Sequence, residues 1–293
     1  MIIQADDVSF SYGNSLVALQ NISFAISAGE RVALTGHNGS GKSTLVKHFN
    51  GLLLPSAGKV WIDGVDTSTV HTAQLAGQVA LLFQNPDDQI CKRTVWDEVV
   101  FGAKNLGYSP SRITALVEEA LSLLALTHCK RSNPHDCGYS ERKRIMMASI
   151  VAMDTPVIVF DEPTAGLDPH EISLFIAMLD ELQKRNKTII IISHDMDFVA
   201  ENMARVMLLA EGRMVFDGPV GELFTRTELI TSSGLCQPQV VQLGYACGLP
   251  EALMSPLECV KALEEQYRCI HSERSGNPDR PASLVLGEET PGG

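Results

Sequence analysis

The chain has 293 residues and 45% of them are hydrophobic, which is enough for one large domain or two modest ones with a sizeable core. Its formal net charge is −12, from 23 Lys and Arg against 35 Asp and Glu. A protein that grips nucleic-acid phosphates needs a basic face. The charge balance therefore argues against a nucleic-acid partner, although a basic protein surface remains a possible partner.

The cysteines and the termini indicate a reduced, soluble setting. There are seven cysteines, an odd number, and no two are spaced as C-x-x-C. This usage fits the cytosol better than a disulfide framework or a zinc site. The first residues, MIIQADDVSF, carry acids where a signal peptide has bases, and no stretch is apolar enough for a membrane span.

The first third of the chain predicts strands around one helix. A helix is expected over Lys42–Asn50, directly after a glycine-rich segment. The predicted strands are Ile3–Phe10, Ile22–Ile26, Arg31–Thr35, Lys59–Ile62 and Val79–Phe83.

The middle of the chain is helical and the alternation of strands and helices then returns. Helices are predicted over Thr94–Asn105, Ser111–Leu126 and Glu141–Ala152. The later elements are the strand Val157–Phe160, the helix Pro169–Arg185, and the strands Thr188–Ile192, Val206–Leu209 and Arg213–Phe216. All-apolar short strands suit a parallel sheet covered on both faces, so the fold class is α/β.

The C-terminal region differs from the rest. Short helical segments are expected around Gly221–Thr225, Gln239–Cys247 and Pro256–Cys269. The segment 272–293 is rich in Gly, Pro, Ser and Glu, which predicts a disordered tail.

A phosphate-binding loop is the most specific motif. Its residues are Gly36, His37, Asn38, Gly39, Ser40, Gly41, Lys42 and Ser43. The loop follows a predicted strand and precedes a helix, so its backbone N–H groups and the helix N-terminus can face an anion. Lys42 is expected to reach the β- and γ-phosphates, Ser43 to ligate Mg²⁺, and Thr44 to add a phosphate contact.

Two acids end a later apolar strand. Asp161 and Glu162 follow Val157–Phe160, and ligands of α/β sheets collect at the carboxyl ends of strands. Asp161 is expected to hold Mg²⁺ through water, and Glu162 to polarise the attacking water, because phosphoryl transfer depends on a positioned nucleophile.

The motifs together resemble those of ATP-binding cassette (ABC) ATPases, over about residues 2–224. The run from Asp161 to Asp168, DEPTAGLD, is similar to the Walker B and D-loop segment of that family. Phe83-Gln84-Asn85-Pro86 looks like its Q-loop, and His194 like its switch histidine. The resemblance implies that Tyr12 stacks on adenine, that Gln84 contacts Mg²⁺ or water, and that His194 bonds the γ-phosphate and positions the attacking water.

The resemblance also sets the expected domains and cofactors. It implies a P-loop NTPase fold with an antiparallel β subdomain and an inserted helical subdomain at about 87–153, together spanning 1–224. A C-terminal dimerisation-type extension follows at 225–271. The implied activity is hydrolysis of ATP with Mg²⁺, in which two cassettes close and reopen face to face.

Within the family, the segments near Gln84–Gln89 and Asp97–Glu98 resemble the energy-coupling factor (ECF) type, which includes cobalt and nickel importer subunits. The resemblance implies a peripheral protein on the cytoplasmic face of the membrane, docked on a transmembrane coupling protein through these acidic segments. Such a subunit does not itself contact the transported substrate, a vitamin or a metal ion.

The chain departs from the family at its signature, LSGGQ. Counting back from Arg144, the aligned residues are Cys137-Gly138-Tyr139-Ser140-Glu141. The signature serine is lost, and Tyr139 adds bulk where a glycine was free. We therefore expect a heterodimer with a paralogous ATPase that supplies an intact signature.

Other interpretations stay open at this point. They are a homodimeric ABC ATPase of another transporter class, with a divergent but working signature, and a mainly regulatory ATP-binding subunit. A soluble cassette acting on ribosomes or DNA is disfavoured, because the chain has one cassette, no long coiled coil and an acidic charge.

Overall fold

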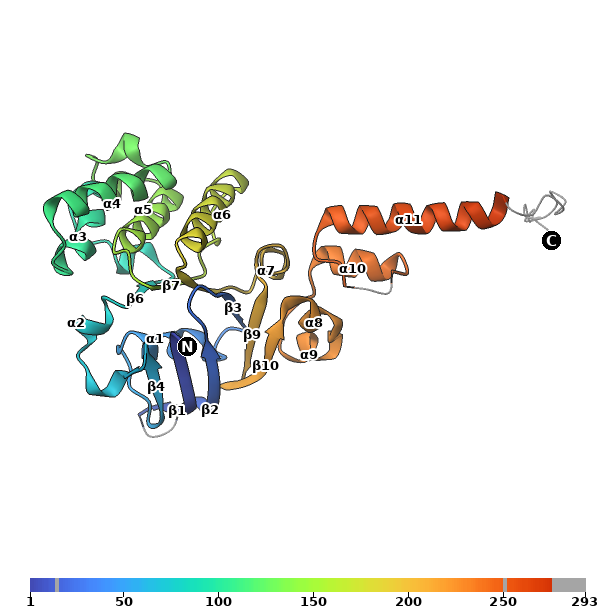
Figure 1. Ribbon diagram of the computed structural model, residues 1–293, viewed down its shortest axis with the longest axis horizontal. Coiled ribbons are helices and arrows are strands. Elements are labelled where there is room, and N and C mark those ends of the chain that lie inside the picture. The colour runs from blue at the N-terminus through green and yellow to red at the C-terminus, as the bar shows by residue number, and fades with distance from the viewer. Residues whose placement is uncertain (14–15, 250–251, 276–293) are drawn as a thin grey trace, which may run out of the picture. The chain divides into compact units, whose positions relative to one another are not determined.

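The chain divides into two compact units at Pro238 (Figure 1). The computed structural model describes residues 1–13, 16–249 and 252–275. The first unit, Met1–Pro238, holds every motif discussed above, and the second begins at Gln239.

A six-stranded sheet forms the centre of the first unit. Its order is β10-β9-β3-β8-β7-β6, with β9 and β10 antiparallel and the other neighbours parallel. Every residue of β7 and β8 is buried, as expected for apolar strands covered on both faces. The strands are β3 (Arg31–Thr35), β6 (Val79–Leu82), β7 (Val157–Asp161), β8 (Thr188–Ile192), β9 (Arg205–Ala210) and β10 (Arg213–Pro219).

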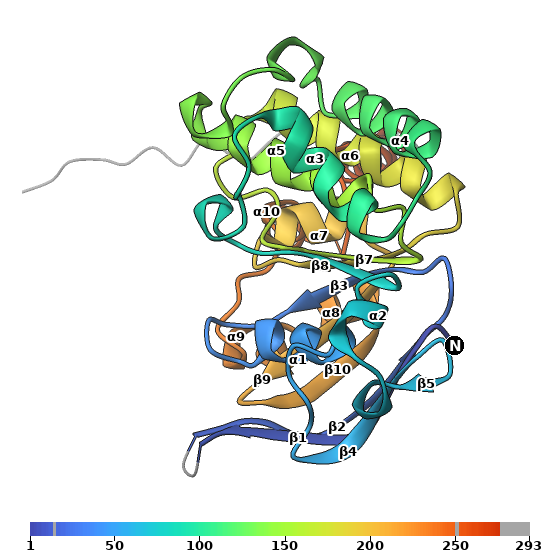
Figure 2. The ribbon, with the colours of Figure 1, turned by 90° about the vertical axis from the view of Figure 1, so that its left-hand side faces the viewer.

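A second, antiparallel sheet carries the N-terminus. Its order is β2-β1-β4-β5, and helix α1 (Lys42–Phe49) lies between it and the central sheet (Figure 2). Side chains of both sheets and of α1, among them Leu45 and Phe49, share one hydrophobic core. The strands are β1 (Ile3–Tyr12), β2 (Leu16–Ile26), β4 (Ala57–Ile62) and β5 (Val65–Asp66).

Helices gather on the opposite side of the central sheet, above β7 and β8 in Figure 2. Thr94 caps α3 by accepting the Asp97 N–H, and Ser109 caps α4 by accepting the Arg112 N–H. These helices are α3 (Val95–Asn105), α4 (Pro110–Leu123), α5 (Tyr139–Val151) and α6 (Pro169–Lys184). The first three lie inside the predicted helical insertion at 87–153.

The remaining helices and turns complete the described part of the chain. The helices are α2 (Thr72–Leu75), α7 (Met196–Asn202), α8 (Val220–Thr225) and α9 (Thr227–Ser232) in the first unit, and α10 (Gln239–Ala246) and α11 (Pro256–Ser275) in the second. Single 3₁₀ turns occur at Thr67–Thr69, Pro86–Asp88, Thr127–Cys129 and Pro134–Asp136. None of the described helices combines the length and the apolar character needed to cross a membrane.

Three of the differences between the predicted and the observed boundaries affect the site or the division of the chain. Strand β2 begins at Leu16 rather than Ile22, because its first half pairs with β1 next to Tyr12. Helices α8 and α9 belong to the first unit, so the separate C-terminal part begins at Gln239 and not at 225. Helix α11 continues through Ser275, past the predicted start of the tail at 272; residues 276–293 lie outside the described part of the chain.

Candidate nucleotide site

The glycine-rich loop connects the end of β3 to the start of α1. Gly36 and Gly41 both have positive φ, 143° and 105°, which favours glycine. A Cβ on Gly36 would lie 2.1 Å from the Leu209 carbonyl oxygen, and one on Gly41 would lie 2.6 Å from that of Ala18. The loop therefore requires glycine at these positions both for its conformation and for its close approach to neighbouring backbone.

Lys42 closes the loop on itself. Its ammonium donates to the carbonyl oxygens of Gly36 at 2.7 Å and His37 at 2.9 Å. Burial lowers the pKa of Lys42, and the negative charges of Glu162 and Asp161 oppose that shift. The ammonium thus lies inside the loop, among acceptors that a phosphate can replace.

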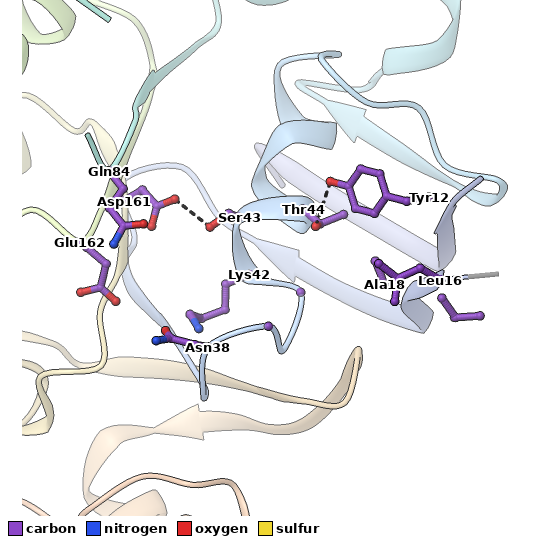
Figure 3. A pocket seen from close by; sticks show the side chains of 13 residues that line it. Tyr12, Leu16, Ala18, Asn38, Lys42, Ser43, Thr44, Gln84, Asp161 and Glu162 are labelled. Atoms are coloured by element: carbon purple, nitrogen blue, oxygen red, sulfur yellow. Dashed lines mark hydrogen bonds between the residues drawn. The ribbon is translucent and has the colours of Figure 1, made fainter. Parts of the chain in front are cut away.

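Ser43 and Asp161 meet although β3 and β7 are separated in the sheet by β8. The Ser43 hydroxyl donates to Asp161 Oδ2 at 2.8 Å, and Figure 3 shows the pair side by side. Burial raises the pKa of Asp161, mainly because a desolvated carboxylate lacks water to stabilise its charge. A hydroxyl and a buried carboxylate are hard oxygen donors, the kind that Mg²⁺ prefers, so these residues fit that ion.

Tyr12 lies at the other end of the pocket. Its hydroxyl and that of Thr44 are 3.2 Å apart, and its side chain remains 42% exposed. Beside it are Leu16, Val17 and Ala18, which were not predicted from the sequence because no strand was expected between Phe10 and Ile22. Leu16 and Val17 are more than half exposed, so this end of the pocket offers an apolar rim and an aromatic ring to a flat base.

Glu162 and His194 form a direct pair. The Nδ1–H of His194 donates to Glu162 Oε1 at 2.7 Å. The carboxyl side chain is only 8% exposed whereas the imidazole is 63% exposed. The glutamate is therefore held at the wall of the site, while the histidine can reach outward to a group that enters from solvent.

The backbone at Glu162 is strained and held from both sides. Its φ of 50° is left-handed, which costs on the order of 1 kcal/mol for a residue other than glycine. Its N–H donates to the Ile192 carbonyl oxygen, and its own carbonyl oxygen accepts a hydrogen bond from the Lys143 ammonium at 2.5 Å. Lys143 also donates to the Ala165 carbonyl at 2.7 Å, so it links α5 to the segment after β7.

Sequence analysis did not single out Lys143, because it stands in a basic run, Arg142-Lys143-Arg144, that looked ordinary. Only 1% of this lysine is exposed. Burial lowers its pKa to about 8, so the ammonium still carries its charge at pH 7. The helix is polar in its first half and apolar only after Arg144, so its pattern gives no signal that Lys143 is buried.

We predict that Lys143→Met destabilises the protein by about 1–3 kcal/mol, because two carbonyls lose a charged donor while the side-chain volume is kept. When a partner ATPase supplies an intact signature, turnover should fall as well, since Glu162 loses one of its two backbone supports. Urea unfolding and steady-state phosphate release measure the two effects. Lys184→Met, at a side chain that is 74% exposed, is the matched control. Equal stability of both variants would contradict the account.

These side chains surround a cavity of about 450 Å³. Of the residues predicted to bind nucleotide, Gly36, His37 and Ser40 shape the loop without lining the cavity, and His194 lies outside the lining set. Gln84 lines it from the segment after β6 (Figure 3). The cavity is lined by Tyr12, Leu16, Val17, Ala18, Asn38, Gly39, Gly41, Lys42, Ser43, Thr44, Gln84, Asp161 and Glu162.

Comparison with known proteins agrees with this geometry. The family description "ABC transporter" matches residues 19–165. The energy-coupling factor transporter ATP-binding protein EcfA of Methanoculleus marisnigri is 37% identical over 243 residues, which cover 83% of this chain and 88% of that protein. The chain belongs to the ABC transporter ATPases, in their energy-coupling factor group. It is therefore an ATP-binding protein and an ATP hydrolase.

Two further proteins are similar to this ABC ATPase over most of its length. The structure of cbiO1 from Clostridium perfringens, described as part of the ABC transporter complex cbiONQ, superimposes with a TM-score of 0.71 at 33% identity; the match covers 85% of this chain and 99% of that one. A longer ABC transporter ATP-binding protein of Methanosarcina acetivorans is 37% identical over 238 residues, and the match covers 81% of this chain but only 39% of that protein.

The divergent signature forms the start of α5. Gly138 is the N-cap, and its N–H donates to Glu141 Oε2 at 3.2 Å. Tyr139 is 46% exposed, and its ring lies beside Gly166 in the D-loop, where an added Cβ would be 2.8 Å from the ring. The tyrosine thus fills space next to the D-loop that a glycine would leave open. Asp168, the last residue of the D-loop run, caps α6 by accepting the Glu171 N–H at 2.8 Å.

Proposed function

We propose that this ABC ATPase energises an ECF-type importer as a peripheral subunit on the cytoplasmic face of the cell membrane. The observation that carries the proposal is the convergence of Ser43 with Asp161, and of Glu162 with His194, beside one phosphate loop. The relatives named after energy-coupling factor transporters support the membrane role.

ATP binds with its phosphates in the loop and its base against Tyr12. Lys42 leaves the carbonyls of Gly36 and His37 and takes the β- and γ-phosphates as acceptors. Ser43, Asp161 and Gln84 would hold Mg²⁺, which would supply positive charge to offset that of the phosphates. Its positive charge would also stabilise the Asp161 carboxylate and so oppose the rise in pKa that burial causes.

Hydrolysis depends on a water molecule placed in line with the γ-phosphate. The Glu162 carboxylate accepts a hydrogen bond from that water, and His194 holds the carboxylate in orientation through the 2.7 Å bond. Because both the side chain and the backbone of Glu162 are fixed, the carboxylate needs little rearrangement to act.

The second ATPase subunit is a paralogue with an intact signature. Gly138 has no hydroxyl, and Glu141 brings a negative charge to a segment that should face a polyphosphate. ATP on this chain's loop is then covered by the partner's signature, whereas ATP on the partner's loop meets Tyr139 and Glu141 and turns over slowly. The second unit supports pairing of subunits, because α11 carries an apolar stripe of Val260, Leu263 and Tyr267 around a hollow of about 330 Å³.

The docking face for the membrane partner differs from the acidic groove expected from the sequence. Glu98 is only 4% exposed and accepts the N–H groups of Cys91 and Lys92, so it does not face a partner. Asp87 pairs with Arg142, with 3.3 Å between Oδ1 and Nε, which ties the Q-loop to the signature helix. Asp88 and Asp97 remain exposed.

A groove beside these residues has the features of a helix-binding site. It measures about 470 Å³, and Val100 and Phe101 provide its apolar surface. Its charged residues are mostly basic: Lys92, Arg93 and Lys104, against Asp97. Lys92 lies 3.7 Å from the centre of the Phe101 ring. An amphipathic cytoplasmic helix with both acidic and basic residues fits this groove.

We expect Phe101→Asp to reduce recovery of the membrane partner by at least about tenfold, since an apolar anchor becomes a charge. Asp88→Lys should act in the same direction, and it leaves the Asp87–Arg142 pair intact. The affinity-tagged chain is expressed in the organism that naturally produces it, and the membranes are solubilised. The membrane proteins that co-purify with it are then quantified by mass spectrometry. Val65→Asp, at an exposed valine on β5, is the control. Unchanged recovery with both groove variants would reject the docking proposal.

A further inference from the structure

Metal-binding side chains gather beside the divergent signature, away from the phosphate loop. His128 and Cys129 lie in the 3₁₀ turn Thr127–Cys129, and Glu141 lies in the first turn of α5. One ligand atom from each of the three residues lies within 4.8 Å of the other two. The sequence had argued against a zinc site because it has no C-x-x-C pair, but the fold assembles these donors from separate segments.

The His128 ring is oriented as a metal ligand is. Its Nδ1–H donates to the Ala125 carbonyl at 3.1 Å, which leaves Nε2 with a lone pair. That nitrogen faces Glu141 Oε1 at 3.2 Å. Two acceptors at this distance repel each other unless a cation, either a proton or a metal ion, lies between them.

The other donors also have their outer partners in place. Glu141 uses Oε2 to accept the Gly138 N–H, which leaves Oε1 for a ligand. The Cys129 thiol is 6% exposed, and the Cys137 thiol is close enough to influence its pKa. Burial raises the pKa of Cys129 to about 11, so the thiol is protonated until a divalent ion displaces that proton.

We propose that His128 Nε2, Cys129 Sγ and Glu141 Oε1 bind a zinc-class divalent transition-metal ion, with water in the fourth position. A mixed nitrogen, sulfur and oxygen set suits Zn²⁺ or Co²⁺ and not Mg²⁺. The half-exposed imidazole, 64% accessible, leaves a path for the ion to enter. Binding fixes the start of α5 and neutralises Glu141 in the segment that replaces the signature.

The test is a titration of the full, reduced chain with Co²⁺, followed by competition with Zn²⁺. We expect one tightly bound Co²⁺ per chain, tetrahedral by its visible spectrum, with a sulfur-to-cobalt charge-transfer band that Zn²⁺ abolishes. Cys129→Ser should remove that band, and His128→Gln, at an exposed side chain, should weaken binding by at least about tenfold. The controls Cys91→Ser and His170→Gln, both exposed, should bind as the unaltered chain does.

Two results would overturn the proposal. One is equal Co²⁺ affinity in the unaltered chain and in both site variants. The other is the absence of a charge-transfer band, in which case a proton alone joins His128 to Glu141 as an ordinary ion pair. Because His128 is exposed, its variant stays informative even if Cys129→Ser impairs folding.

Discussion

Restoring the signature should raise the ATP turnover of the isolated chain by at least about tenfold. The variant combines Gly138→Ser, Tyr139→Gly, Ser140→Gly and Glu141→Gln. It supplies a hydroxyl and free backbone amides to the γ-phosphate held by a second copy, and one positioned donor of this kind can change a rate by about 10²-fold. Phosphate release at saturating ATP, over a range of protein concentrations, measures the change.

The matched control is Tyr139→Phe, which keeps the bulk beside Gly166 and should leave turnover as it was. The rate of the restored variant should rise with protein concentration, because two copies must meet. If the restored variant assembles into dimers but turns over no faster than the unaltered chain, the departed signature is not what limits hydrolysis.

Removing the carboxylate at Glu162 should abolish the gained turnover. In the restored background, Glu162→Gln is expected to return turnover to about the rate of the unaltered chain, because the positioned general base is lost. ATP binding should change little, because Glu162 bonds to His194 and to no residue of the phosphate loop. Phosphate release and equilibrium binding of a fluorescent ATP analogue separate the two effects.

Glu211 offers a matched control for Glu162. It also follows a strand, and its φ is likewise 50°, but it is exposed in the turn between β9 and β10. Glu211→Gln should therefore keep both binding and turnover. A similar loss of turnover in both variants would point to backbone strain and not to the Glu162 carboxylate.

The sequence was sufficient where local pattern and tertiary environment agree. The strands Arg31–Thr35 and Thr188–Ile192 were predicted to the residue, because short, mainly apolar runs buried on both faces have few alternatives. Asp161 and Ser43 were each expected to hold Mg²⁺, and the sheet order brings the Asp161 carboxylate within 2.8 Å of the Ser43 hydroxyl.

The sequence was insufficient where distant segments determine a residue's environment. Glu98 looks like part of an acidic surface, yet the fold buries it as the acceptor for two backbone N–H groups. Lys143 looks like one of three surface bases, yet it lies in the core and supports Glu162. The pairing of β2 with the end of β1 set the apolar rim at Leu16, which hydrophobic pattern alone did not predict.

The most direct test of the central claim is the turnover of the unaltered, full-length chain purified without any other ATPase. The chain's own loop and Glu162 are complete, and its signature is not. We therefore predict slow phosphate release that stays flat as protein concentration rises and that Glu162→Gln barely lowers. Brisk turnover of the unaltered chain alone, rising with concentration and lost in Glu162→Gln, would contradict the account, because two identical signatures would then suffice.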